Sequence, residues 1–85
     1  MEVGYHRKFI KNFGKLSSEI QEAFYEKLEI FCKDKKSNVL NNHKLHGKLK
    51  NLRSINVTGD YRALFKENRN EIIFMKVGTH SELFN

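Results

Sequence analysis

The segment Leu52-Arg-Ser-Ile-Asn-Val-Thr-Gly-Asp-Tyr-Arg-Ala-Leu-Phe-Lys66 decides the fold, because two stretches of alternating apolar and polar residues flank a short polar turn. Side chains alternate between the faces of a strand, so paired strands must set apolar positions opposite apolar ones. A three-residue connection pairs Val57 with Tyr61 and Asn56 with Arg62, whereas a two-residue turn would set a cation against the apolar side. We therefore expect the longer connection, with a polar face and a core face.

Two more strands are expected outside this hairpin. Residues 71–77 follow the turn Glu67-Asn-Arg-Asn70 and predict another antiparallel strand. Residues 2–6 are typical of a short first strand. Leu64 breaks the alternation, because it falls on the polar face and nothing in the sequence accounts for it. The expected strands are therefore 2–6, 52–57, 61–67 and 71–77.

Two helices are expected between the first strand and the hairpins. Phe9, Phe13 and Leu16 recur on one side of a first helix, and Gly14 is well placed to end it. The second helix has a longer apolar stripe, which predicts a buried face. The members of this stripe are Ile20, Phe24, Leu28, Phe31 and Cys32.

The ends of the second helix also carry signals. Ser17 or Ser18 can cap its first turn, and Ser18 with Gln21 matches the spacing of a capping box. Several lysines crowd the last turn, where they favour the negative end of the helix dipole. We expect the helix to stop near Lys36 or Ser37.

The order β-α-α-β-β-β predicts one α+β domain over residues 1–85, with a small, mostly antiparallel sheet and both N-terminal helices packed on one face. Cys32 is the only cysteine, so no intramolecular disulfide forms, which fits a reducing, cytoplasmic setting. No apolar run approaches the roughly 20 residues of a membrane span. The N-terminus lacks the regions of a signal peptide.

The charge of the chain is uneven. Its formal net charge is +6, and between residues 43 and 62 Asp60 is the only acid. The excess indicates an anionic partner, either nucleic acid or an acidic protein, with a merely solvated basic loop as the alternative. The cations of this segment are Lys44, Lys48, Lys50, Arg53 and Arg62.

Histidines, cations and one carboxylate gather in the second half of the chain, at expected strand ends and turns. An imidazole exchanges protons near neutral pH, and a guanidinium binds phosphate oxygens, so His80 and Arg62 fit RNA cleavage. A histidine in a solvated turn is the alternative for His80. Asp60 either shapes its turn or serves as a base or an orienter of a histidine. His43 and His46 lack further ligands at metal-binding spacing, so no metal and no cofactor is expected.

Three motifs resemble the RelE/ParE superfamily of type II toxin–antitoxin toxins, and within it the RelE/YafQ branch of ribosome-dependent mRNA interferases. They are His43-x-Leu-x-Gly47, Gly59-Asp60-Tyr61-Arg62 and Gly78-Thr-His80-Ser-Glu-Leu-Phe84. The resemblance implies a RelE-like fold and a toxin that cuts mRNA in the ribosomal A site by metal-independent attack of a 2′-hydroxyl. It also implies a cognate antitoxin, a monomeric free toxin, and contacts to the 70S ribosome with its mRNA and 16S rRNA.

The resemblance also implies roles for individual residues. His80 matches the catalytic position near the last strand, Arg62 the cation at the scissile phosphate, and Asp60 and His43 further catalytic positions. Together with the basic segment, the resemblance gives the expected RNA-binding residues: Lys44, His46, Lys48, Lys50, Arg53, Asn56, Tyr61 and Phe84. We expect Tyr61 to pack more than to stack.

Two positions depart from the resemblance. Asn56 stands where the YafQ branch has a histidine, and Phe84 where RelE has a tyrosine. Fewer proton-transfer groups therefore remain, and His43 or His46 could substitute for them. Two alternatives stay open: a ParE-like toxin that inhibits DNA gyrase, and a catalytically weak member that only binds RNA or its antitoxin.

Overall fold

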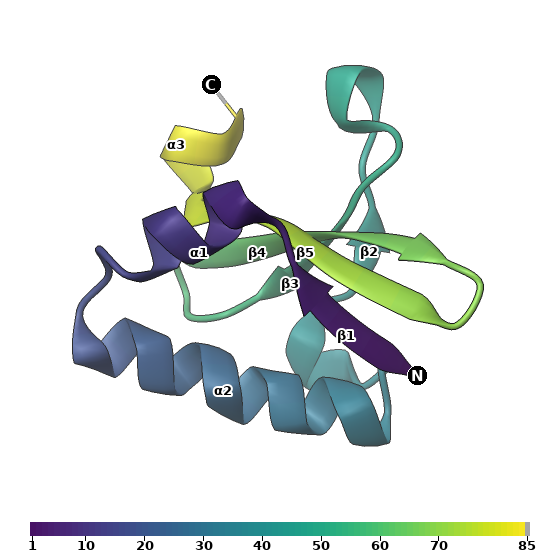
Figure 1. The fold of residues 1–85 in the computed structure, drawn as a ribbon, viewed down its shortest axis with the longest axis horizontal. Helices are drawn as coiled ribbons and strands as arrows, with labels where there is room; N and C mark the ends of the chain where they lie inside the picture. The colour runs from purple at the N-terminus through teal and green to yellow at the C-terminus, as the bar shows by residue number, and fades with distance from the viewer. Residues whose placement is uncertain (85) are drawn as a thin grey trace.

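The computed structural model describes residues 1–84 of the chain. A five-stranded sheet forms its centre; α2 lies across one side of this sheet, and α3 and the segment between β2 and β3 rise on the other (Figure 1). The elements are β1 (Glu2–Tyr5), α1 (Arg7–Phe13), α2 (Ser18–Lys33), the 3-10 turn η1 (Asn38–Leu40), β2 (His43–Lys44), the 3-10 turn η2 (Gly47–Leu49), β3 (Arg53–Asn56), β4 (Tyr61–Asn68), β5 (Glu71–Thr79) and α3 (His80–Phe84).

The sheet confirms the α+β fold and the register of the hairpin. Its strand order is β1-β5-β4-β3-β2, and all neighbours are antiparallel except β1 and β5. Asn56 pairs with Arg62, and the Val57 amide donates to the Tyr61 carbonyl at 2.9 Å, as the three-residue connection requires. Two features are additional: the short strand β2, and the parallel pairing of the first strand with the last.

Leu64, the residue that breaks the alternation, is fully buried on the polar face. Leu45, which follows β2, is also buried, and neither leucine belongs to the main core cluster. A small second apolar patch therefore lies on this face. β4 and β5 shift register between Leu64 and Phe65, where Phe65 pairs with Phe74. Such a bulge places one extra residue in β5 and increases the local twist.

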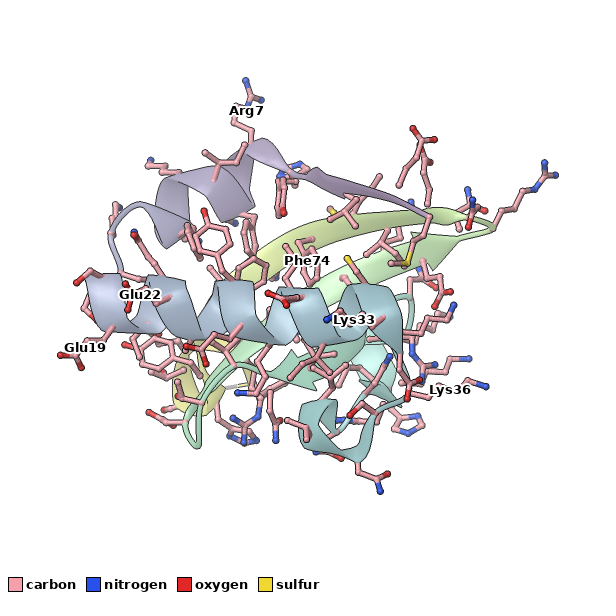
Figure 2. All side chains as sticks on the ribbon, turned by 90° about the horizontal axis from the view of Figure 1, so that it is seen from below. Arg7, Glu19, Glu22, Lys33, Lys36 and Phe74 are labelled. Atoms are coloured by element: carbon pink, nitrogen blue, oxygen red, sulfur yellow. The ribbon has the colours of Figure 1, made fainter. Side chains whose placement is uncertain are left out.

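The main core is aromatic and lies between the sheet and both N-terminal helices. Phe74 is fully buried at its centre, and Figure 2 shows it among the side chains behind α2. Aromatic rings 4.5–7 Å apart in tilted or edge-on geometry add roughly 0.5–1.5 kcal/mol per pair beyond the burial of their area. The rings with centroids 5.2–6.0 Å from that of Phe74 belong to Tyr5, Phe9, Phe24, Phe31 and Phe65.

The ends of the helices depart in part from the expectations. Gly14 caps α1 as predicted. The Ser18–Gln21 capping box is wrong: Ser17 is the N-cap of α2, and its hydroxyl accepts from the Ile20 amide at 3.3 Å. The Gln21 side chain instead donates through Nε2 to the Phe13 carbonyl at 2.9 Å, which ties the two helices together.

The far end of α2 corrects two further predictions. The helix ends at Lys33, earlier than expected, and the extended backbone of Asp34 caps it. Cys32 is exposed and does not fill the core. Phe31 takes the inward position, and the next residue of a helix lies about 100° around the axis. Among the described residues no helix is long and apolar enough to cross a membrane.

Candidate functional site

A cavity of about 370 Å³ lies on the polar face of the sheet, between the start of α3 and the segment that contains β2. It brings together four residues that the sequence singled out: His43, Arg62, His80 and Phe84. These residues come from β2, β4 and α3, so the fold of the whole second half of the chain positions them. The complete lining is Asn41, His43, Leu45, Ser54, Arg62, His80 and Phe84.

One hydrogen bond holds the His43 ring and also determines which ring nitrogen carries the proton. Its Nδ1 lies 2.8 Å from the Asn41 carbonyl oxygen. A carbonyl oxygen only accepts, so Nδ1 carries the proton, and in the neutral ring Nε2 keeps its lone pair. Asn41 reaches this position through a left-handed backbone, with φ of 48°, which asparagine tolerates better than most residues. The exposed His43 ring therefore presents a proton acceptor.

Arg62 is fixed by the turn that precedes it. Its Nη1 lies within hydrogen-bonding distance of the carbonyl oxygens of Thr58, Gly59 and Tyr61, at 3.0, 3.2 and 3.0 Å. Within residues 1–84, Nε and Nη2 have no hydrogen-bond acceptor, so this edge of the guanidinium can bind an anion. Lys27 braces the same turn from α2, because its Nζ donates to the Val57 carbonyl at 3.1 Å.

His80 is the first residue of α3, not a turn residue beyond Val77, because β5 continues to Thr79. The His80 amide donates to the Asp60 carbonyl at 3.0 Å. Its ring lies against that of Phe84, with centroids 4.8 Å apart. The short helix thus holds the imidazole between a backbone anchor and an aromatic ring.

A reciprocal capping box starts α3. The Thr79 amide donates to Glu82 Oε1 at 2.8 Å, and the Glu82 amide donates to Thr79 Oγ1 at 3.2 Å. Hydrogen bonds to the ionised Glu82 carboxyl, first from the Thr79 backbone amide and then from the Thr79 hydroxyl, lower the pKa of this exposed group. The sequence Thr79-x-x-Glu82 carried this signal, which the sequence reasoning missed.

Asp60 contributes its backbone to the site. Its carbonyl anchors His80, and its amide donates to the Thr58 hydroxyl at 3.3 Å. Its side chain is exposed and does not line the cavity. Both alternatives for the Asp60 side chain, shaping the turn or taking part in proton transfer, therefore stay predictions.

Within residues 1–84, two polar atoms of β3 are buried without a hydrogen-bond partner: Ser54 Oγ and Asn56 Oδ1. Ser54 pairs with His43 across β2 and lines the cavity, and Asn56 pairs with Arg62 across β4. Buried polar groups are normally paired, so these two leave hydrogen-bonding capacity unused beside the site. The sequence signal for Ser54 is its position two residues before Asn56, on the same face of the strand.

The remaining predicted RNA-binding residues lie elsewhere. Arg53 Nε donates to Asn42 Oδ1 at 2.9 Å, which holds β3 to the segment before β2, and Lys44, Lys50 and Arg53 line a separate cavity. His46 and Lys48 are exposed around η2, away from the candidate cavity. Half-buried Tyr61 packs against the main core, as expected, and does not line the cavity that Arg62 lines. RNA contacts of these residues stay predictions.

Within residues 1–84, no group of three histidine, cysteine or acidic side chains is placed to hold a metal ion. The site instead offers two imidazoles, a guanidinium and uncommitted polar atoms of β3. This set can bind an anion, accept a proton at His43 Nε2 and exchange a proton at His80.

Solved structures show the same fold over nearly the full length. YafQ from E. coli strain BL21(DE3) matches with a TM-score of 0.81 and 20% identity, over 99% of this chain and 98% of that one. YafQ in the E. coli DinJ-YafQ complex matches with a TM-score of 0.74 and 22% identity, over 99% and 98%. The archaeal RelE-RelB complex from Pyrococcus horikoshii OT3 matches with 0.73 and 22%, over 92% of each chain.

The likeness to these structures concerns the fold alone, since the identities are low. No curated protein sequence matches the chain. The family model described as the bacterial toxin of type II toxin-antitoxin systems, YafQ, matches residues 1–85. Because this match covers the whole sequence, the chain belongs to the YafQ family of type II toxin–antitoxin toxins.

Proposed function

We propose that this toxin is a ribosome-dependent mRNA endoribonuclease. The observation that carries the proposal is the cavity that gathers His43, Arg62 and His80, with His43 Nε2 oriented as an acceptor. RNA cleavage by its own 2′-hydroxyl needs a proton acceptor, a proton donor and a cation for the phosphate, and all three are present.

The reaction assigns one task to each group. His43 Nε2 takes the proton of the 2′-hydroxyl, and the resulting oxygen attacks the adjacent phosphorus. The phosphorus–O5′ bond breaks, and His80 in its protonated form donates a proton to the leaving 5′-oxygen. The products are a 2′,3′-cyclic phosphate and a 5′-hydroxyl end. Arg62 stabilises the negative charge of the pentacoordinate transition state through Nε and Nη2.

Phe84 and Asn56 are the two positions that depart from the resemblance, and neither side chain can transfer a proton. Phe84 has no hydroxyl, so its part is to hold the His80 ring, against which it packs. Asn56 accepts at Oδ1 and can orient a 2′-hydroxyl or a base edge but exchanges no proton. The pair of imidazoles therefore carries the proton transfers.

A cognate antitoxin is part of the proposal. The family is defined by toxin–antitoxin pairs, and the solved relatives include complexes named DinJ-YafQ and RelE-RelB. A segment of the antitoxin that covers Arg62 and His80 would neutralise the toxin by closing the cavity.

The proposal is tested by inducing the wild type, His80→Ala and Arg62→Ala in cells and mapping 5′ ends on a translated mRNA by primer extension. We expect growth arrest with new, translation-dependent 5′ ends for the wild type, and at least a hundredfold fewer ends for His80→Ala, because removing a general acid costs about 10²–10⁴ in rate. Lys11→Ala, an exposed cation of α1, is the matched control and should cut like the wild type.

The other outcomes separate the alternatives. Arrest without cuts but with altered plasmid supercoiling would replace the proposal with gyrase inhibition. No arrest from well-expressed, folded wild type would leave a protein that only binds, and would direct attention to Asn56 and Phe84.

A further inference from the structure

A second cavity, of about 550 Å³, lies on the other side of α3 from the candidate site. Figure 1 shows α1 and α3 near the same end of the sheet, and residues of both helices line this cavity. Its lining is Lys8, Asn12, Lys15, Leu16, Tyr61, Lys76, Val77, Gly78, Glu82 and Leu83. We call it the lysine groove, after Lys8, Lys15 and Lys76.

The lysine groove is basic, and its cations are uncommitted. Within residues 1–84, Lys8, Lys15 and Lys76 form no ion pair or side-chain hydrogen bond, whereas the ion pairs that do form involve Lys33 and Lys35. Glu82 is the only acid of the groove, and its Oε1 is occupied by the Thr79 amide. A concave surface of one sign raises the local potential and attracts an anion.

The topology makes the groove contiguous with the candidate site. Helix α3 is their common wall: His80 and Phe84 line the site, and Glu82 and Leu83 line the groove. β1 pairs with β5 only as far as Phe74, so beyond this residue the outer edge of β5 has no neighbouring strand among the described elements. The groove lies along this open edge, where α1 passes beside β5.

We propose that the lysine groove binds backbone phosphates of the same single-stranded RNA whose scissile phosphate lies at Arg62. The inference rests on the proposed function and adds a second binding segment to it. Lysine ammonium groups on flexible stems suit phosphates of any sequence, because they act as point charges and read no base. An RNA chain that leaves the candidate site past His80 meets these ammonium groups around α3.

Sequence reasoning missed the groove because its cations are far apart in the chain. Lys8 and Lys15 belong to the first helix and the turn after it, and Lys76 to the last strand. Arg7, Lys8, Lys11 and Lys15 form a basic stretch without an acid, but nothing in the sequence links this stretch to Lys76. Only the passage of α1 beside β5 brings them to one cavity.

The test compares Lys8→Gln/Lys15→Gln/Lys76→Gln with the control Lys11→Gln/Lys33→Gln/Lys36→Gln, which removes the same charge from exposed positions outside the groove. Binding of a 2′-O-methyl RNA oligonucleotide, which cannot be cleaved, is measured over a range of salt. Each phosphate contact that a variant loses reduces the magnitude of the slope of log K against log salt by about 0.7 for single strands. We therefore expect the magnitude of the slope to fall by about 2 for the groove variant and by much less for the control.

Equal slopes for the two variants, or a wild type that does not bind the oligonucleotide, would overturn the inference. A loss of binding to polyglutamate, with RNA binding intact, would assign the groove to an acidic polypeptide and overturn it as well. If the wild type cuts mRNA but the groove variant and the control have equal slopes, the groove proposal fails and the proposed function stands. Wild type that binds through the groove but cuts nothing would refute the endoribonuclease instead. If the triple variant does not fold, Lys8→Gln and Lys76→Gln are measured singly.

Discussion

The two faces of the sheet differ in how their buried groups are packed and hydrogen-bonded. On the face toward α2, Phe65 and Phe74 are fully buried among other rings. On the opposite face, buried polar atoms of Ser54 and Asn56 have no hydrogen-bond partner among residues 1–84, and the hydrogen bonds of the Arg62 guanidinium to the turn all come from Nη1. The first face stabilises the fold, and the second keeps hydrogen-bonding capacity for a ligand, as functional sites commonly do at some cost to stability.

The largest predicted change in stability comes from the aromatic face of the sheet. Phe74→Ala should lower the free energy of unfolding by about 3–5 kcal/mol, because it removes a buried ring and leaves a cavity. Chemical denaturation of the variant beside Ile10→Ala, at a residue 59% exposed, measures the difference. A loss below about 1 kcal/mol for Phe74→Ala would contradict the central place given to this ring.

Arg62→Lys tests the opposite face while keeping its charge. A lysine lacks the planar fork, so it cannot bind the turn carbonyls and a phosphate at the same time. We expect about 1 kcal/mol lower stability and at least tenfold slower cleavage. Arg7→Lys, at an exposed position of α1, should change neither quantity. Full cleavage by Arg62→Lys would show that charge alone suffices.

Ser54→Ala and Ser17→Ala should act in opposite directions, although they make the same chemical change. Ser54 Oγ is buried without a partner, so its removal should leave stability unchanged or raise it by up to about 1 kcal/mol. Ser17 caps α2, and its removal should cost about 1 kcal/mol. Thermal unfolding of both variants measures the contrast. Destabilisation by Ser54→Ala would reveal a hydrogen bond to its hydroxyl in solution.

The smallest effect concerns Glu82. Its pKa is lowered by the Thr79 amide and hydroxyl, so its stabilisation of α3 is present above the ordinary glutamate pKa of about 4.3 and lost as pH falls through the lowered value. Glu82→Gln should therefore speed hydrogen exchange of the Thr79 amide near neutral pH and match the wild type in strong acid. The same difference at both pH values would mean that the ionised carboxylate is not the cause.

Local patterns predicted much of the fold. The alternation around the turn of residues 58–60 decided the register of the hairpin, because a one-residue slip would bury Arg62. The patterns also predicted both helices. The apolar stripe of the second helix wrongly placed Cys32 in the core, because the pattern alone does not show that burial ends at Phe31. Leu64 became understandable only once Leu45 was found buried as well.

Contacts between distant segments could not be predicted. The pairing of β1 with β5 leaves no periodic signal in either segment, and β2 is too short to show one. In the candidate site, the sequence and its resemblance identified His43, Arg62 and His80 but not which of their neighbours were already bonded. Arg53 is bonded to Asn42, whereas Ser54 is uncommitted, and both facts depend on tertiary packing.

The parallel pairing of β1 with β5 also governs when the toxin can fold during its own synthesis. Residues Glu2–Tyr5 emerge from the ribosome well before their partners Glu71–Phe74. Contacts of such long sequence separation form late, since the closure of a long loop precedes any stabilisation from them. His80 lies beyond these partners in the chain, so the imidazole reaches its position only after β5 has been made. The candidate site is therefore assembled only after β5 and the start of α3 have been synthesised.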